Sequence, residues 1–314
     1  MLRNLVARII LVWIALILVV ALLGDVSIAA TNVGCASADF LHIGQGARAA
    51  GFGGAFTAIS DGSTATYWNP AGLSELENAE VTLGHFAWLQ DITVEQAAFG
   101  LPISDGLVLG TAVTYVNYGT IEGYDVAGAP TSELSAYDLA LGISLGYRFA
   151  ENWSGGVTAK VVNQRLDVYS ATAFAADLGL KYHGESYAVA AVITNFGSNL
   201  KFDQIGEKLP TAARLGLAVS PFDGAVVTSL DLEKRFQGDL VLRQGIQFGF
   251  SDRYYLRTGY DYLPAQNGRS LATAFSVGAG LSLGFADIDY AFTPNDKSSG
   301  EDLHRFSLVF RFAR

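Results

Sequence analysis

The side chains that most often carry enzymatic chemistry are few in this sequence, and they form no recognisable set. The four histidines, His42, His85, His183 and His304, are scattered, and none has a partner at metal-ligand spacing. The chain also lacks the His-Glu-x-x-His pattern of zinc proteases and the Gly-x-Ser-x-Gly turn of serine hydrolases. We therefore predict that the protein is not an enzyme and uses no metal or cofactor. An esterase built from a Ser and a His on a barrel wall is the enzymatic alternative.

One glycine-rich segment imitates a nucleotide-binding turn. The run Gly44-Gln45-Gly46-Ala47-Arg48-Ala49 resembles the phosphate-binding loop of dinucleotide-binding folds. It does not follow a strand of a βαβ unit, which that loop requires. We interpret these glycines as a sign of tight packing.

Composition points to a membrane protein without membrane-spanning helices. Half of the 314 residues are apolar, 16% are charged, and mean hydropathy is +0.29. After the first 30 residues, no apolar run approaches the ~18 residues of a spanning helix. Transmembrane barrels avoid such runs because apolar residues alternate with small or polar ones. The net charge of −10 argues against a nucleic-acid partner, and the single Cys35 excludes an internal disulfide.

The N-terminus has the features of an export signal. Arg3 and Arg8 precede an unbroken apolar run, residues 9–23, and Ser27-Ile28-Ala29 fits a signal-peptidase site. We predict a cleaved signal peptide over residues 1–29. An uncleaved anchor, cleavage after Ala38 and lipidation of Cys35 are the alternatives.

From residue 79 onward the sequence alternates with a period of two. Between Tyr137 and Phe149, the odd positions are large and apolar, and the even positions are small or polar. This pattern predicts strands with one lipid-facing side. Fourteen such stretches are expected, near residues 79–88, 92–101, 106–117, 136–149, 152–164, 173–183, 186–196, 210–220, 223–233, 241–250, 253–262, 270–283, 285–292 and 303–313.

The connections between these strands sort by parity. Links that leave even-numbered strands are tight, whereas most links that leave odd-numbered strands are long: 118–135, 165–172, 197–209, 234–240, 263–269 and 293–302. Bacterial outer-membrane barrels have short periplasmic turns and longer outside loops. The sequence therefore predicts an all-β fold, an antiparallel transmembrane barrel of about fourteen strands in the bacterial outer membrane. Aromatic girdles are expected at the short-turn end (Tyr147, Phe149, Trp153, Phe250, Tyr254) and at the long-loop end (Trp88, Tyr115, Tyr118, Tyr137, Tyr260, Tyr262).

Parity also predicts which charges face the lumen. The inward set comprises Asp138, Arg148, Lys160, Arg214, Arg243, Arg257, Asp261, Arg305 and Arg311. Buried charges require partners or water. They form either a structural network, with Arg48, Asp61, Glu75 and Glu77 as candidate partners, or a polar path or gate.

Residues 30–78 differ from the rest and are expected to form an irregular plug with short helices inside the barrel of residues 79–314. The segment is rich in Gly and Ala and reaches Asn69-Pro70-Ala71-Gly72, where Pro70 restricts Asn69 to extended or turn geometry. Small inward wall residues suggest that the plug packs against the wall; these are Gly142, Gly146, Gly216, Gly249, Gly278 and Gly280.

Two stretches of the plug resemble a known family. Phe40 to Ala58, and Asp61 with Tyr67 to Leu73, are similar to the start of mature PorV/PorQ-type proteins, within the FadL-like class of outer-membrane proteins. The resemblance implies a fourteen-stranded barrel with an N-terminal plug. It assigns the plug motif to Gly44, Gly46, Arg48, Gly53, Gly54, Asp61, Trp68, Asn69, Pro70, Ala71 and Gly72.

The resemblance implies two functions. The first is an accessory role in type IX-like protein secretion, with secreted proteins or secretion-system subunits as partners. The second is a FadL-like channel for fatty acids or other hydrophobic small molecules. In both cases we expect a monomer surrounded by outer-membrane lipid.

Overall fold

The computed structural model describes residues 37–88, 91–202, 205–222, 224–238, 240–262, 275–294 and 302–312. The predicted signal peptide and Cys35 lie outside the described residues, as do the first residues of the strand expected from residue 270.

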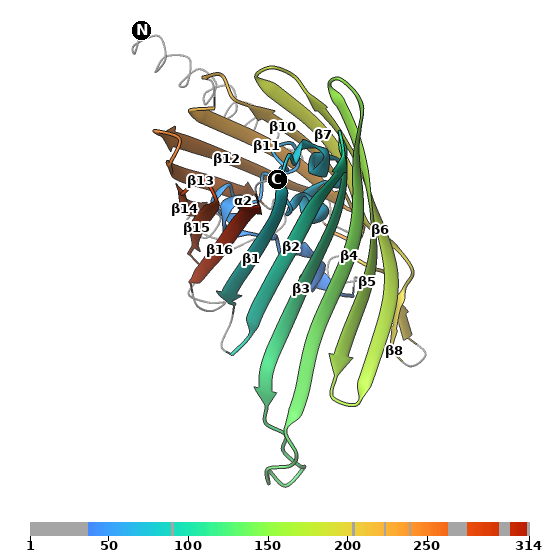
Figure 1. The fold of residues 1–314 in the computed structure, drawn as a ribbon. Coiled ribbons are helices and arrows are strands. Elements are labelled where there is room, and N and C mark those ends of the chain that lie inside the picture. The colour runs from blue at the N-terminus through green and yellow to red at the C-terminus, as the bar shows by residue number, and fades with distance from the viewer. Residues whose placement is uncertain are drawn as a thin grey trace.

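The chain folds as a closed antiparallel barrel of fourteen strands, which confirms the predicted fold class (Figure 1). Each barrel strand pairs with its neighbours in the chain, and β1 pairs with β16 to close the wall. The strands are β1 (Ala79–Ala87), β2 (Thr93–Ser104), β3 (Leu107–Ile121), β4 (Leu134–Ala150), β5 (Trp153–Leu166), β6 (Tyr169–His183), β7 (Tyr187–Gly197), β10 (Ala212–Val219), β11 (Val226–Arg235), β12 (Leu240–Phe250), β13 (Tyr254–Tyr262), β14 (Phe275–Ser282), β15 (Ala286–Thr293) and β16 (Leu303–Phe312).

Alternation along each strand gives the barrel an apolar outer face. On β4, Leu141, Ile143 and Leu145 are exposed, whereas Gly142 and Ser144 between them are buried. A water-soluble protein would hide such side chains, so an exposed apolar band of this size is typical of a surface that contacts lipid.

The aromatic girdle at the short-turn end lies where the sequence predicts. Its five members, Tyr147, Phe149, Trp153, Phe250 and Tyr254, are all exposed. At the long-loop end two predicted members do not face outward. The Tyr118 hydroxyl donates to Asp138 inside the barrel, and Trp88 packs on the buried apolar cluster of the lumen. The two-residue period itself places both rings inward, because Tyr118 shares the face of buried Val116 and Trp88 shares the face of buried Phe86. Grouping the aromatic residues by strand end overlooked this.

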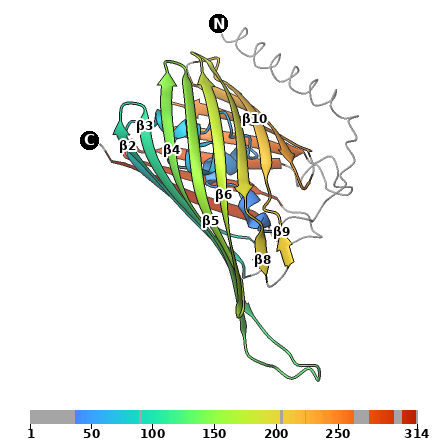
Figure 2. The same cartoon turned by 90° about the vertical axis from the view of Figure 1, so that its right-hand side faces the viewer.

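The wall is much taller on one side. Strands β3 to β6 have 14–17 residues, but β10, β14 and β15 have 8 each. At ~3.3 Å per residue, these lengths are about 56 Å for β4 and about 26 Å for β15. The tall strands project at the long-loop end (Figure 2).

This projection corrects two of the predicted loops. The connection expected over residues 165–172 is a tight turn at Asp167, whose φ is +54°, because β5 and β6 both continue into it. Within the expected loop 197–209, β8 (Leu200–Phe202) pairs with β9 (Ile205–Glu207) as a small separate hairpin. Three-residue strands are too short to show a period of two.

Residues 37–78 lie inside the barrel (Figures 1 and 2). They form four short helices, η1 (Asp39–His42), α2 (Ala47–Gly51), α3 (Ala65–Trp68) and η2 (Pro70–Glu75). We refer to residues 37–78 as the plug.

A belt of inward glycines receives the plug. A Cβ at Gly179 would overlap the Asn69 side chain, and one at Gly259 would overlap the backbone of Phe52 and Gly53. Only a residue without a side chain permits such close approach. Nine strands contribute one glycine each: Gly100, Gly110, Gly146, Gly156, Gly179, Gly216, Gly245, Gly259 and Gly278. The wall is therefore shaped to this plug, as a packed core is shaped to its own side chains.

Candidate functional site

Asn69 is the central anchor of the plug. Its side chain is fully buried, and its Oδ1 accepts a hydrogen bond from Ala71 N at 3.1 Å, which caps η2. Its Nδ2 donates to Thr57 O in the plug and to Leu180 O on β6, both at 3.4 Å. Pro70 occupies the first position of η2, where a missing N–H costs nothing. One side chain thus joins two plug segments to the wall.

Replacement of Asn69 by Ala should loosen the plug. The loss of a cap costs about 0.5–2 kcal/mol, and here the wall contact is lost as well. We expect a lower midpoint of thermal unfolding and faster leakage of a small dye from liposomes that contain the barrel. Asn78→Ala, a half-buried position at the end of the plug, is the control. Unchanged leakage and unchanged unfolding in Asn69→Ala would contradict the anchoring role.

The other motif residues hold the plug together internally. Trp68 Nε1 donates to Gln45 O at 3.0 Å, and its ring fills the space that a Cβ on Gly44 would need. Gly46, Gly53 and Gly54 have positive φ values. Ala71 and Gly72 are buried beneath Asn69, and a Cβ on Gly72 would overlap Ser60.

Arg48 and Asp61 pair within the plug through two hydrogen bonds of 2.5 and 3.0 Å. Burial by itself would raise the pKa of Asp61, but the adjacent Arg48 guanidinium outweighs burial and holds that pKa below its usual range. Both are candidate partners for wall charges by sequence, and the structure instead joins them to each other. Glu77, a third candidate, is exposed, whereas Glu75 binds Lys181 of β6 at 2.8 Å.

Two wall residues outside the predicted set hold the plug backbone. Asp231 on β11 accepts hydrogen bonds from Phe56 N and Thr57 N at 3.0 and 2.8 Å. Lys181 on β6 donates to Ile59 O and Ser60 O at 3.0 and 3.1 Å.

The predicted lumen charges mostly lie inside the barrel in pairs. Glu233, absent from the prediction, is fully buried and binds Arg214 at 2.6 Å, Arg235 at 2.7 Å and Arg243 at 2.8 Å. Arg243 also lies 3.8 Å from Asp261. This cluster is a structural network of the kind that keeps buried charges compensated.

The remaining predicted charges also have identifiable neighbours. Lys160 pairs with Asp177 at 2.6 Å, Arg257 with Asp289 at 2.5 Å, and Arg311 with both Glu80 and Asp287. Asp138 accepts from Tyr118 and Gln164, and Arg148 is exposed at the rim and donates to Ser74 O at 2.9 Å. Arg305 lies 4.5 Å from the centre of the Phe86 ring, and its Nε has no hydrogen-bond partner among the described residues.

The alternation of side chains along the strands was sufficient to identify the charged partners that are absent from the predicted set. Glu80, Asp177, Lys181, Asp231, Glu233, Asp287 and Asp289 all occupy inward positions of predicted strands. Opposite charges on one inner face were the available signal.

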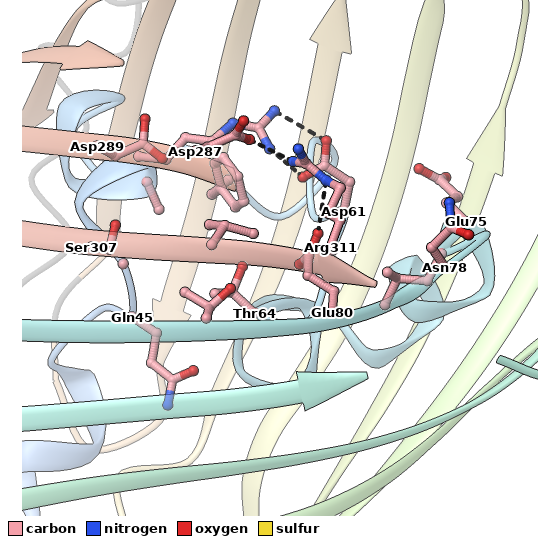
Figure 3. Close-up of a pocket in the computed structure, with 18 of the residues that line it drawn as sticks. Gln45, Asp61, Thr64, Glu75, Asn78, Glu80, Asp287, Asp289, Ser307 and Arg311 are labelled. Atoms are coloured by element: carbon pink, nitrogen blue, oxygen red, sulfur yellow. Dashed lines mark hydrogen bonds and ion pairs between the residues drawn. The ribbon is translucent and has the colours of Figure 1, made fainter. Parts of the chain in front are cut away.

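A polar cavity of 300 Å³ opens at the short-turn end of the barrel, between the plug and β1, β15 and β16 (Figure 3). Arg311 lies between Glu80, at 3.3 Å, and Asp287, at 2.5 Å. Six carboxylates line the cavity: Asp61, Glu75, Glu77, Glu80, Asp287 and Asp289. We call this space the inner cavity.

The opposite half of the lumen is apolar. Phe86, Val94, Val116, Val162 and Ala173 point inward there and are almost fully buried. Helix η1 and strand β8 pack on them through Phe40, Leu41 and Leu200. Above this cluster the hydrogen-bonded side chains of Tyr118, Asp138 and Gln164 cross the inner face. Beyond them the tall wall ends in Ile121, Leu166 and Tyr169, which are 38%, 54% and 65% exposed. We call the buried cluster and these rim residues together the apolar track.

Two classes of site are absent from the part of the chain that the structure describes. No helix there is long and apolar enough to cross a membrane. No group of three or more His, Cys, Asp or Glu side chains is arranged to bind a metal ion within the same ranges.

Comparison with known proteins gives a family and a fold. Residues 26–310 match the model of a family described as Uncharacterised protein family (UPF0164). No curated protein matches the sequence.

Among solved structures, the barrel is similar to the CymD monoaromatic hydrocarbon channel, with a TM-score of 0.65 and 14% identity over 87% of this chain and 98% of CymD. The toluene transporter TodX of Pseudomonas putida has a TM-score of 0.59 and 15% identity, over 85% of this chain and 96% of TodX. A FadL homologue of Pseudomonas aeruginosa has a TM-score of 0.57 and 13% identity, over 84% of this chain and 98% of the homologue. At these identities the likeness establishes a FadL-like fold.

Proposed function

The chain belongs to the uncharacterised protein family UPF0164, and we propose that it is an outer-membrane channel for hydrophobic small molecules. The apolar track is the observation that carries this proposal. A channel for polar solutes needs a wet lumen, whereas on this side of the barrel most side chains at the rim of the tall wall and against the plug are apolar.

The contacts that close the track are ones that an apolar ligand can replace. Phe40 and Leu41 of η1 meet the wall through apolar contacts, and the hydrogen bond from Tyr67 to Leu41 O at 2.9 Å stays within the plug. Neutral His42 fits this setting, because burial, aided by the positive charge of Arg235, lowers its pKa to about 3. Ligand binding here exchanges one set of apolar contacts for another.

The similar solved structures include proteins whose titles name a monoaromatic hydrocarbon channel and a toluene transporter. Those titles support the channel over the secretion role that the PorV/PorQ resemblance implies. The secretion role would place the binding surface on the outside loops. Pull-down from solubilised outer membranes separates the two, because co-purified secretion subunits would contradict the channel.

Replacement of Val162 by Thr should weaken passage of apolar solutes. Thr has the shape of Val, but its hydroxyl costs roughly 1–3 kcal/mol to bury without a partner. We expect uptake of labelled toluene into liposomes to fall about tenfold, which corresponds to 1.4 kcal/mol. Val157→Thr, on the outer face of the same strand, is the matched control. Equal uptake by both variants would overturn the assignment of the track.

A further inference from the structure

A second, small cavity of 30 Å³ lies between the plug and β3 to β5. Phe40 and Leu41 of η1 line it, and both also belong to the buried apolar cluster of the lumen. Ala140 of β4 lines it as well and packs against the same cluster. The small cavity therefore adjoins the buried part of the apolar track, and we call it the plug cavity.

Two polar side chains that line the plug cavity each carry an oxygen without a hydrogen-bond partner among the described residues. These oxygens are Gln45 Oε1 and Thr66 Oγ1. Gln45 is 3% exposed and Thr66 is 1% exposed. Buried polar atoms are nearly always paired. A polar group that enters this cavity therefore meets two oxygens that are ready to bind it.

The orientation of the Gln45 amide follows from its contacts with β3. Its Nε2 donates to Thr114 Oγ1 at 3.0 Å and to Val113 O at 3.4 Å. A carbonyl oxygen such as Val113 O only accepts, so the NH₂ group faces β3 and the free atom of Gln45 is the acceptor Oε1. The amide points away from the carboxylates of the inner cavity (Figure 3).

Lys160 of β5 adds a donor to the lining of the plug cavity. Its Nζ lies 2.6 Å from Asp177 Oδ2 and donates to Asn195 Oδ1 at 3.0 Å. An ammonium group has three N–H donors, so one is left for a ligand. Asp177 already compensates the positive charge. The plug cavity thus combines donors from Lys160 and Thr66 with an acceptor from Gln45, and its lining has no uncompensated charge.

This combination discriminates between the end groups of apolar molecules. A hydrocarbon would leave the buried polar atoms unpaired. A carboxylate would be buried without a free counter-charge and would face the Gln45 oxygen. A hydroxyl accepts from Lys160 or Thr66 and donates to Gln45. A cavity needs about 10–15 Å³ per water by this measure, so 30 Å³ accommodates a terminal CH₂–OH group and not a ring.

We propose that the protein binds and carries straight-chain primary alcohols, with the alkyl chain in the apolar track and the hydroxyl in the plug cavity. This inference rests on the proposed channel function and names its substrate class. The alkyl chain replaces apolar contacts that Phe40 and Leu41 make with the wall. The hydroxyl binds Gln45, Thr66 and Lys160.

The test is binding of labelled 1-dodecanol, dodecane and dodecanoate to the full-length protein in nanodiscs, corrected for partition into protein-free nanodiscs. The wild type should bind 1-dodecanol at least fivefold more tightly than either of the other two. Thr66→Val should weaken binding of 1-dodecanol about fivefold, the effect of one neutral hydrogen bond, and leave dodecane unchanged. Gln45→Met removes the acceptor and should cause a similar loss.

Thr194→Val is the matched control for Thr66→Val. Thr194 is also buried, its hydroxyl has no partner within the described part of the chain, and it lines neither cavity. Both valine variants should unfold at the temperature of the wild type, because neither hydroxyl is bonded in the free protein. Thr194→Val should bind 1-dodecanol as the wild type does.

The inference is overturned if the wild type binds dodecane or dodecanoate as tightly as 1-dodecanol. It is equally overturned if Thr66→Val and Gln45→Met bind 1-dodecanol as Thr194→Val does. In either case, continued uptake of toluene into liposomes would leave the channel function standing. Absence of toluene uptake and of binding by all three probes would contradict the channel function itself.

Discussion

Replacement of Gly259 by Ala is expected to displace the plug and destabilise the barrel by about 1–3 kcal/mol, the range for overpacking of a filled core. A Cβ at this position would overlap the backbone of Phe52 and Gly53, and Gly53 has a φ of +64° that few other residues adopt. The wall strand cannot move aside, because β13 is held between β12 and β14. The plug must shift instead.

The measurement is thermal unfolding in detergent, followed by dye leakage from liposomes. Gly249→Ala is the matched control, since its Cβ would meet only the Tyr255 ring, at an ordinary 3.4 Å, and Gly224 O at 3.7 Å. We expect Gly249→Ala to behave as the wild type. If both glycine variants unfold alike and neither leaks, the belt does not position the plug.

Replacement of Glu233 by Ala should have a larger effect on stability, about 3–5 kcal/mol, because it leaves buried cations uncompensated. The Glu233 carboxylate is fully buried and accepts from Arg214, Arg235 and Arg243 at once. Arg214 and Arg243 are themselves almost fully buried. Water reaches neither guanidinium to replace the lost partner.

A double-mutant cycle checks this explanation. Glu233→Ala combined with Arg243→Met should be less destabilised than the sum of the single variants, because one unpaired charge is gone. Glu77→Gln, at an exposed carboxylate of the plug, should change the unfolding free energy by less than about 0.5 kcal/mol. Strict additivity in the cycle would contradict direct coupling between Glu233 and Arg243.

The sequence determined the barrel because its signal is local and repeated. Side chains on a strand alternate, so each stretch such as residues 137–149 reports its own inner and outer face without knowledge of any neighbour. The alternation of short and long connections then indicated a transmembrane barrel with short turns at one end and longer loops at the other. The same alternation placed Lys160, Arg214 and Arg257 inside the lumen, where the structure also has them.

Tertiary structure decided which partner each charged side chain meets. Arg48 meets Asp61 rather than a wall charge, and Lys181 meets the plug backbone, because the path of the plug is irregular and has no period to follow. The height of the barrel wall was also decided by the tertiary structure. Strands β3 to β6 extend into residues that were predicted to be loops. Their outward side chains above the membrane are polar, so these residues lack the apolar outer face by which the other strands were identified.

The inner cavity and the apolar track exist only in three dimensions. Gln45 lies in a glycine-rich segment of the sequence, and its hydrogen bond to Thr114 forms only because the fold places β3 beside it. The apolar track likewise combines residues of β1 to β6 with η1 and β8. Local periodicity determines which face of the wall a side chain occupies. The closure of the barrel, which brings together residues far apart in the sequence, determines which residues that side chain contacts.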